Sequence, residues 1–206
     1  NKIKVIHLGY RKDDFKPISQ EDKKIFLDRH DYPDKFLLYI GRLESKKNVL
    51  SLIKAYKKTS RKWPLILAGR PGNYGYAAIE KMCAETDLKD DIMLLGYVSQ
   101  VNYPKLMASA TGFVFPSKFE GFGLPVLEAM ASGVPVTCSN ILALKEVAQD
   151  AALYFDPDNI EDIKNKIEII FNNQEQRTDL IAKGLERAKQ FSWSKVARET
   201  LDYILE

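Results

Sequence analysis

The chain has 206 residues, of which 45% are hydrophobic and 29% are charged, and its formal net charge is +3. This profile is typical of one soluble globular domain with its own core, and the mixing of cations with anions argues against a nucleic-acid-binding stripe. No apolar run reaches the roughly 20 residues that a membrane-spanning helix needs. Cys83 and Cys138 form no disulfide or metal pattern and fit a reducing cytoplasm.

The chain opens with NKIKVIHLGYRKDDF, which has no start methionine. This stretch also lacks the long apolar segment and the cleavage site of a signal peptide. We therefore expect a piece of a larger protein that begins partway through a fold, with a strand at Lys4–Leu8 near its start.

Short apolar runs rich in β-branched and aromatic residues recur along the rest of the chain. Most are continuously apolar, which favours strands buried on both faces, as in a parallel sheet. After the first, the predicted strands are Phe36–Ile40, Pro64–Ala68, Ile92–Leu95, Gly112–Phe115, Val134–Cys138 and Ala152–Phe155.

Helical patterns alternate with these strands. The predicted helices are Gln20–Arg29, Val49–Ser60, Tyr76–Glu85, Pro104–Ser109, Leu124–Ser132 and Leu142–Ala148, followed by the C-terminal helices Ile160–Phe171, Glu175–Phe191 and Ser194–Leu205. Repeated βα units predict a doubly wound, Rossmann-like α/β sheet with right-handed crossovers. Ser192 and Ser194 are candidate caps of the last helix.

Ligands of such sheets bind beyond the carboxyl ends of the strands, so the loops after the strands are the places to look. Arg42 directly follows the second predicted strand, and Lys47 lies near the start of the next helix. Arginine offers a planar fork of donors and lysine a compact charge, which together suit a diphosphate. The alternative is that both are ordinary surface cations.

The stretch Glu120–Pro125 (EGFGLP) lies between a predicted buried strand and a helix. Pro125 suits a first helical turn, and glycine lets a ligand come close to the free amides of Gly121–Leu124. This turn is therefore a candidate anion site, although a plain βα turn would also use glycine.

Glu128 lies one turn into the apolar helix LPVLEAMASG, where an unpaired charge is costly. Its Cβ leans back toward the loop mouth, so Glu120 and Glu128 flank the anion site. Two carboxylates there suit a ligand with hydroxyl groups at both ends of a diphosphate, such as a nucleotide sugar. The alternative for Glu128 is a buried salt bridge.

These segments together resemble the C-terminal half of a retaining GT-B glycosyltransferase of family four, and the resemblance covers essentially all of residues 1–206. The segments that carry it are GRLESKKN (Gly41–Asn48), LILAGRPG (Leu65–Gly72), LGYVS (Leu95–Ser99), PSKFEGFGLPVLEAMASGVPV (Pro116–Val136) and FSWSKVA (Phe191–Ala197). The opening IHLGYRKDDFKP is similar to the segment that begins this half.

The resemblance implies a role for each matching residue. Gly41, Arg42 and Lys47 would bind the donor diphosphate, and the two cations would stabilise the charge that grows on the leaving group. Glu120, with the backbone of Gly121, Phe122, Gly123 and Leu124, would contact the sugar and phosphate. Glu128 would hold the ribose hydroxyls, and the backbone at Tyr97 and Val98 would meet the base. Catalytic roles fall to Arg42, Lys47 and Glu120, and Asn140 would help to line the site.

The same resemblance implies that the acceptor-binding N-terminal half lies outside this chain. The donor would be a GDP- or UDP-sugar, with GDP-mannose first and UDP-glucose second, and Ser99 and Gln100 stand where such enzymes vary. The acceptor would be a glycan or a lipid-linked glycan in the cytoplasm, with peripheral association at the inner membrane face left open. No cofactor or metal is expected, and His7 and His30 lack a second ligand at useful spacing.

Two other functions compete with a glycosyltransferase. A non-catalytic nucleotide-sugar-binding module would use the same Arg42, Lys47, Glu120 and Glu128. A dinucleotide-dependent dehydrogenase is disfavoured because no G-x-G-x-x-G follows a first strand, and no P-loop sequence is present.

Overall fold

The computed structural model describes residues 3–85 and 87–205. Within them, six parallel strands form one sheet in the order β3-β2-β1-β4-β5-β6. The strands are β1 Leu37–Ile40, β2 Leu65–Ala68, β3 Ile92–Gly96, β4 Gly112–Phe115, β5 Val136–Ser139 and β6 Ala152–Phe155. The predicted doubly wound parallel sheet is confirmed. The predicted extent of 1–206 as one domain stays a prediction, and its two ends lie outside the described residues.

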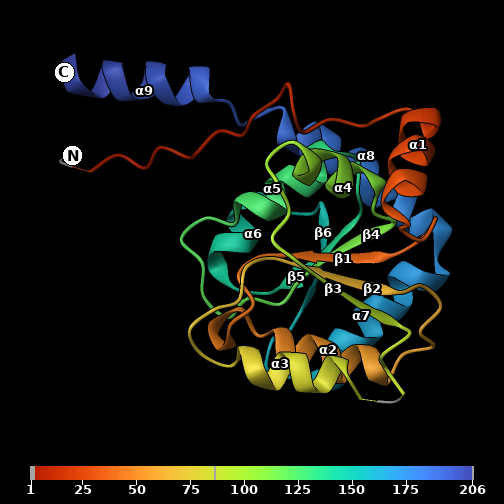
Figure 1. Cartoon of the computed structure of the whole chain (residues 1–206). Coiled ribbons are helices and arrows are strands. Elements are labelled where there is room, and N and C mark those ends of the chain that lie inside the picture. Colours follow the sequence, from red (N-terminus) through yellow and green to blue (C-terminus); the bar gives the residue numbers. More distant parts are fainter. Residues whose placement is uncertain (1–2, 86, 206) are drawn as a thin grey trace.

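Helices cover both faces of the sheet, with α2, α3 and α7 on one face and α4, α5 and α8 on the other (Figure 1). The helices are α1 Gln20–His30, the 3-10 turn η1 Ser45–Lys47, α2 Val49–Lys57, α3 Tyr76–Cys83, α4 Asn102–Ser109, α5 Leu124–Ala131, α6 Leu142–Ala148, α7 Ile160–Asn172, α8 Gln174–Ala188 and α9 Trp193–Leu205. Every predicted helix is present, with ends displaced by a few residues.

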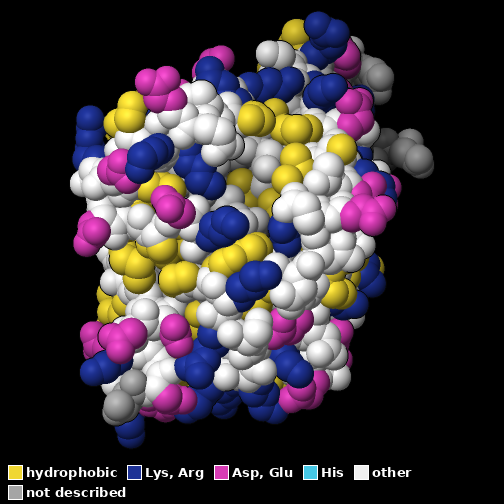
Figure 2. Space-filling model, turned by 90° about the vertical axis from the view of Figure 1, so that its right-hand side faces the viewer, with side chains coloured by type: hydrophobic (Ala, Val, Ile, Leu, Met, Phe, Trp, Pro, Cys, Tyr) yellow, Lys and Arg dark blue, Asp and Glu magenta, His cyan; other side chains and the backbone are white. Residues whose placement is uncertain are grey.

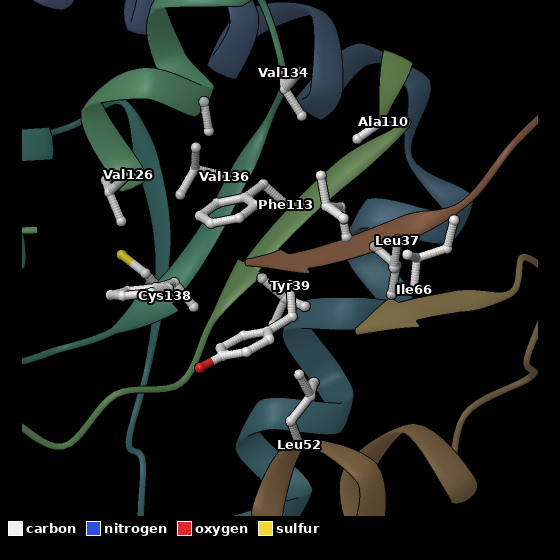
Figure 3. Close-up of a cluster of buried hydrophobic side chains, with 14 of the residues drawn as sticks. Leu37, Tyr39, Leu52, Ile66, Ala110, Phe113, Val126, Val134, Val136 and Cys138 are labelled. Carbon is white, nitrogen blue, oxygen red and sulfur yellow. The ribbon is translucent and has the colours of Figure 1, made fainter. Parts of the chain in front are cut away.

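The core joins the sheet to both helical layers. Tyr39 of β1 and Phe113 of β4 lie in it, with Leu52 of α2 on one side of the sheet and Val126 of α5 on the other (Figure 3). All four side chains are 0% exposed, which is the burial expected where helices cover both faces of a parallel sheet.

The strand order reverses at the centre of the sheet. β1 pairs with β2 on one side and with β4 on the other, so the chain winds outward in both directions from the β1–β4 pair. In an open α/β sheet the carboxyl ends of two such strands diverge into a crevice where ligands bind. The loops that follow β1 and β4 are therefore the first to consider.

The predicted strand Lys4–Leu8 is wrong. The segment is extended but pairs with no strand among the described residues, and Ile3 and Val5 are 85% and 71% exposed. The sheet edges are β3 and β6, so this stretch has the apolar composition of a strand without a ladder to join. It leaves the body on the same side as α9, whose N-cap is Ser192: the Lys195 amide donates to Ser192 Oγ (3.1 Å) (Figure 1).

Figure 2 shows one face of the molecule, the right-hand side of Figure 1. Cationic, anionic and hydrophobic side chains are interspersed there. On this face the mixed charge pattern of the sequence is also the pattern of the surface.

Candidate functional site

The first two loops at the carboxyl edge form one connected surface. Leu43 makes a parallel bridge with Pro71, and the Gly72 amide donates to the Leu43 carbonyl (2.9 Å). Gly69 has a φ of +149°, and a Cβ there would overlap the carbonyl oxygen of Gly41. Glycine is thus required at position 69, where these two loops touch.

Lys47 and Glu120 meet across the point where the strand order reverses. Lys47 ends the η1 turn after β1, and Glu120 lies in the loop after β4. Lys47 Nζ donates to Glu120 Oε1 at 2.6 Å, and their side chains are 19% and 14% exposed. The structure therefore brings together two of the predicted site residues that lie far apart in the sequence.

The η1 turn is held in place by the segment that follows β6. Asn48, which follows Lys47, has a left-handed backbone (φ 58°) and is buried. Its side-chain amide donates to the Pro157 carbonyl (2.8 Å), beyond the end of β6. Lys47 is consequently aimed by a fixed turn and not by a mobile loop.

Arg42 is exposed and lies in the same loop as Lys47, directly after β1. Its guanidinium has no carboxylate partner among the described residues, whereas its carbonyl accepts a hydrogen bond from the Tyr39 hydroxyl (3.0 Å). Burial raises the pKa of Tyr39 far above its usual value, and the charges of Glu120 and Glu44 add to this rise. The phenol therefore stays a donor and fixes the backbone of Arg42 while the side chain is free to bind an anion.

The glycine-containing turn presents unused amide groups. The N–H groups of Gly121, Phe122, Gly123 and Leu124 donate to no acceptor in the part of the chain that the structure describes. Gly123 has a φ of +100° and opens α5, whereas a Cβ at Gly121 would point into open space. The fold explains the glycine at 123, and the empty space at 121 is room for a ligand at the N-terminus of α5.

Glu128 is partly buried on α5, as its sequence context predicts, and it is hydrogen-bonded to a tyrosine. The Tyr103 hydroxyl of α4 donates to Glu128 Oε2. Burial raises the pKa of Glu128 to about 7, although the Tyr103 hydrogen bond and the charge of Arg11 act to lower it. The predicted alternative of a buried salt bridge is not what the structure shows, because the direct partner is a phenol.

Tyr97 and Val98 follow β3, the edge strand that pairs with β2. Tyr97 is 57% exposed, and the guanidinium of Arg70 lies over its ring at 4.4 Å from the centroid. The exposed planar pair Arg70–Tyr97 is a surface on which another flat group can stack. Asn140, after β5, is exposed, and its amide donates to the Phe155 carbonyl (2.8 Å).

Sequence reasoning missed three residues next to the site: Arg70, Tyr103 and His7. His7 Nε2 is 2.7 Å from Glu146 Oε1, and its ring lies 6.1 Å from that of Phe122 in the glycine-containing turn. These contacts join segments that are distant in the chain, so no spacing in the sequence predicts them. His30 instead bonds the Phe26 carbonyl within its own helix (2.8 Å).

Two features are absent from residues 3–85 and 87–205. No group of three or more His, Cys, Asp or Glu side chains lies in an arrangement that could hold a metal ion. No helix in these ranges has the length and apolar character needed to cross a membrane.

Comparison with known proteins identifies the family and relatives of this chain. Residues 20–187 match the family described as glycosyl transferases group 1. The O-antigen chain mannosyltransferase B of Escherichia coli is 40% identical over 171 residues, which are 81% of this chain and 45% of that protein. The O-antigen chain mannosyltransferase RfbU of Salmonella typhimurium is 33% identical over 182 residues, 88% of this chain and 47% of that protein. The chain thus spans about half the length of these relatives.

Among solved structures, the Anabaena protein Alr3699/HepE in complex with UDP has a TM-score of 0.89 at 20% identity, covering 98% of this chain and 57% of that one. This likeness shows the fold, a Rossmann-like parallel sheet of the kind that forms one half of the GT-B fold. Because the family match covers more than half of the residues, the chain belongs to the group 1 glycosyl transferases.

Proposed function

We propose that this chain is the donor-binding domain of a retaining glycosyltransferase that transfers a hexose from a nucleotide diphosphate sugar. The observation that carries the proposal is the Lys47–Glu120 pair at the β1–β4 reversal, beside the unused amides of residues 121–124. One cation, one carboxylate and a set of N–H donors at one point suit the junction between a phosphate and a sugar.

The diphosphate would lie between Arg42, Lys47 and the N-terminus of α5. The charge of Lys47 is balanced by Glu120, whereas Arg42 has no such partner among the described residues. Arg42 is then the cation available for first contact, and Lys47 adds its remaining donors. Fixed donors aimed at a leaving group lower the barrier because negative charge develops there as the sugar–phosphate bond breaks.

The two carboxylates would act at opposite ends of the ligand, with Glu120 at the transferred sugar and Glu128 at the ribose. The base would lie near Tyr97 and Val98, where Arg70 and Tyr97 offer a stacking surface. No metal is needed in this arrangement, because Arg42, Lys47 and the amides supply the positive charge. Addition of a chelator should therefore leave donor binding unchanged.

GDP-mannose is our first choice of donor and UDP-glucose the second. Two relatives named above are mannosyltransferases by their printed names, which favours mannose. The acceptor, a glycan or a lipid-linked glycan, would bind an N-terminal half, as expected for a chain half as long as its relatives. The whole enzyme would work in the cytoplasm, and association with the inner membrane face is part of the proposal.

A thermal-shift panel of GDP, UDP, ADP and their sugars tests donor binding. A ligand at 100 times its dissociation constant adds about 2.7 kcal/mol to the free energy of unfolding, which raises the melting temperature measurably. We expect the largest rise with GDP or GDP-mannose. If no nucleotide in the panel raises the melting temperature, the proposal is refuted.

A non-catalytic nucleotide-sugar-binding module remains the second candidate, because binding alone would use the same residues. The two are separated by transfer assays on a protein that carries an N-terminal half. If the protein transfers the sugar and both Arg42→Ala and Lys47→Ala abolish this transfer, the glycosyltransferase is supported. Donor binding without transfer or donor hydrolysis supports the module.

The division between the two carboxylates has its own test. Glu128→Ala should weaken binding of GDP and GDP-mannose alike, since both carry the ribose. Glu120→Ala should mainly weaken the sugar-bearing form. Equal losses for both ligands in both variants would contradict this assignment.

A further inference from the structure

Tyr103 is held rigidly beside the site by contacts that do not involve its hydroxyl. Its ring meets the ring of Phe15 edge-on at 5.1 Å between centroids, and Phe15 is 1% exposed. The Arg11 guanidinium in turn lies over Phe15 at 5.6 Å. The phenol therefore cannot leave its place without breaking this packing.

The hydroxyl of Tyr103 is a permanent hydrogen-bond donor. Burial raises the pKa of Tyr103 well above 10, and the charge of Glu128 raises it further. The phenol thus keeps its proton at any pH at which the protein works, and it donates to Glu128 Oε2. The other oxygen, Oε1, accepts no hydrogen bond from the described residues. It is also not one of the fully buried polar atoms that lack a hydrogen-bond partner, so solvent or a ligand can reach it.

Few charged or titratable groups act on the Glu128 carboxyl. Tyr103 faces it from α4, and Arg11 acts on it from the N-terminal segment, where Arg11 Nε also pairs with Asp14 Oδ2 at 3.1 Å. Burial raises the pKa of Glu128 to about 7, and Tyr103 and Arg11 both counteract that rise. Near neutral pH, the Tyr103 hydrogen bond therefore helps to decide whether the carboxyl is charged.

We propose that Tyr103 is a positioning residue for Glu128: its hydroxyl holds Oε2 and leaves Oε1 as the acceptor offered to the ribose hydroxyls of the donor. This inference rests on the proposed function, in which Glu128 binds the ribose. A charged, fixed carboxylate accepts hydrogen bonds from hydroxyl groups more strongly than a neutral or mobile one. Tyr103 would therefore set both the affinity for the nucleotide and its pH dependence.

Tyr56 shows what a purely structural tyrosine looks like in this chain. It is 0% exposed, and its hydroxyl donates to the carbonyls of Trp63 (3.0 Å) and Asp91 (3.2 Å), which tie α2 to neighbouring backbone. The hydroxyl of Tyr103, in contrast, goes to a titratable carboxylate at the candidate site. Tyr56→Phe is therefore the matched control for Tyr103→Phe, because each removes one phenolic hydroxyl and keeps the ring.

The first measurement needs no ligand. In protein with isotope-labelled glutamate, carboxyl-carbon NMR follows each carboxyl through its titration, and the Glu128 signal is the one missing from Glu128→Gln. Tyr103→Phe should raise the pKa of Glu128 by about one unit, since a hydrogen bond to a charged group contributes about that much. Tyr56→Phe should leave it in place. An unchanged Glu128 pKa in Tyr103→Phe overturns the proposal.

The second measurement is GDP affinity by calorimetry at about pH 7 and about pH 8.5. At the lower pH, Tyr103→Phe should bind GDP roughly three- to tenfold more weakly than the unmodified chain, because a larger fraction of Glu128 is neutral. At the higher pH most of this loss should disappear. Equal weakening at both pH values would show that Tyr103 does not act through the charge of Glu128, and it would overturn the proposal.

The two measurements also separate this inference from the proposed function. If the unmodified chain binds neither GDP nor UDP, the proposed function fails and the ribose part of this inference fails with it. The carboxyl titration still decides in that case whether Tyr103 controls Glu128.

Discussion

Lys47 Nζ and Glu120 Oε1 lie 2.6 Å apart although 73 positions separate the two residues in the chain. The pair joins the loop after β1 to the loop after β4 at the reversal of the strand order. An ammonium group has three donors, so a single bond to Glu120 leaves two for a phosphate. The ion pair can therefore fix the geometry of the site and still take part in binding.

A double-mutant cycle on Lys47→Ala and Glu120→Ala should give a coupling energy of about 1–3 kcal/mol in urea unfolding, because both groups are largely shielded from water. The control is the Lys58–Glu161 pair, whose side chains are 54% and 55% exposed. Its cycle should stay below about 1 kcal/mol. Coupling in the Lys47 pair as weak as in the control would show that the contact is incidental.

Arg42→Ala should separate binding from stability. Its guanidinium has no ion-pair partner among the described residues, so the free energy of unfolding should change by less than about 0.5 kcal/mol. GDP binding should weaken by about tenfold or more, since the loss of a charge-assisted contact to phosphate is of that order. Calorimetry checks the affinity, and Arg198→Ala, exposed on α9, is the control. A wild-type affinity in Arg42→Ala would remove Arg42 from the site.

The fold was predictable because each strand carries its own signal. The continuously apolar runs PLILA and GFVF predict strands covered on both faces, and β2 and β4 are such strands. KVIHL carries a similar signal but forms no strand, because strand formation also needs a pairing partner that composition does not reveal. The place of a segment in the sheet is a tertiary property, and only the alternation of βα units hints at it.

The candidate site was predictable where one motif holds its residues. Glu120 and Glu128 lie in one continuous stretch, and Lys47 was placed near them through the resemblance; the structure joins Lys47 to Glu120. Tyr103 was missed because its contact with Glu128 depends on how α4 packs beside α5. A tyrosine on a half-buried helix usually means packing, so the sequence holds no signal for this role.

Glu128→Gln should stabilise the protein at neutral pH while weakening nucleotide binding. The pKa of Glu128 rises from 4.5 to about 7 on folding, so ionisation favours the unfolded chain as pH rises from 4.5 toward 7. Above that range the cost is constant and on the order of 3 kcal/mol, and glutamine removes it. Below about pH 4.5 the carboxyl is neutral in both states, and the gain should vanish.

Urea unfolding at about pH 8 and about pH 4 measures this difference. Glu161→Gln is the control, because Lys58 lowers the pKa of Glu161 and removal of that carboxylate brings no such gain. A Glu128→Gln variant that is no more stable at the higher pH would show that the carboxyl carries no burial cost.

Gly123→Ala should lower the stability of the fold, whereas Gly121→Ala should lower donor binding, although the two glycines are only two positions apart. At Gly123 the φ of +100° strains any other residue, and a Cβ would overlap Leu144 Cδ2 on α6, so we expect a loss of about 1–3 kcal/mol in unfolding free energy. At Gly121 a Cβ meets nothing within 4 Å, so stability should stay within about 0.5 kcal/mol. Gly121→Ala should nevertheless weaken GDP-mannose binding, since its methyl group takes the space beside the free amides. Calorimetry on this folded variant decides the matter: full affinity would place the phosphate and sugar away from the turn.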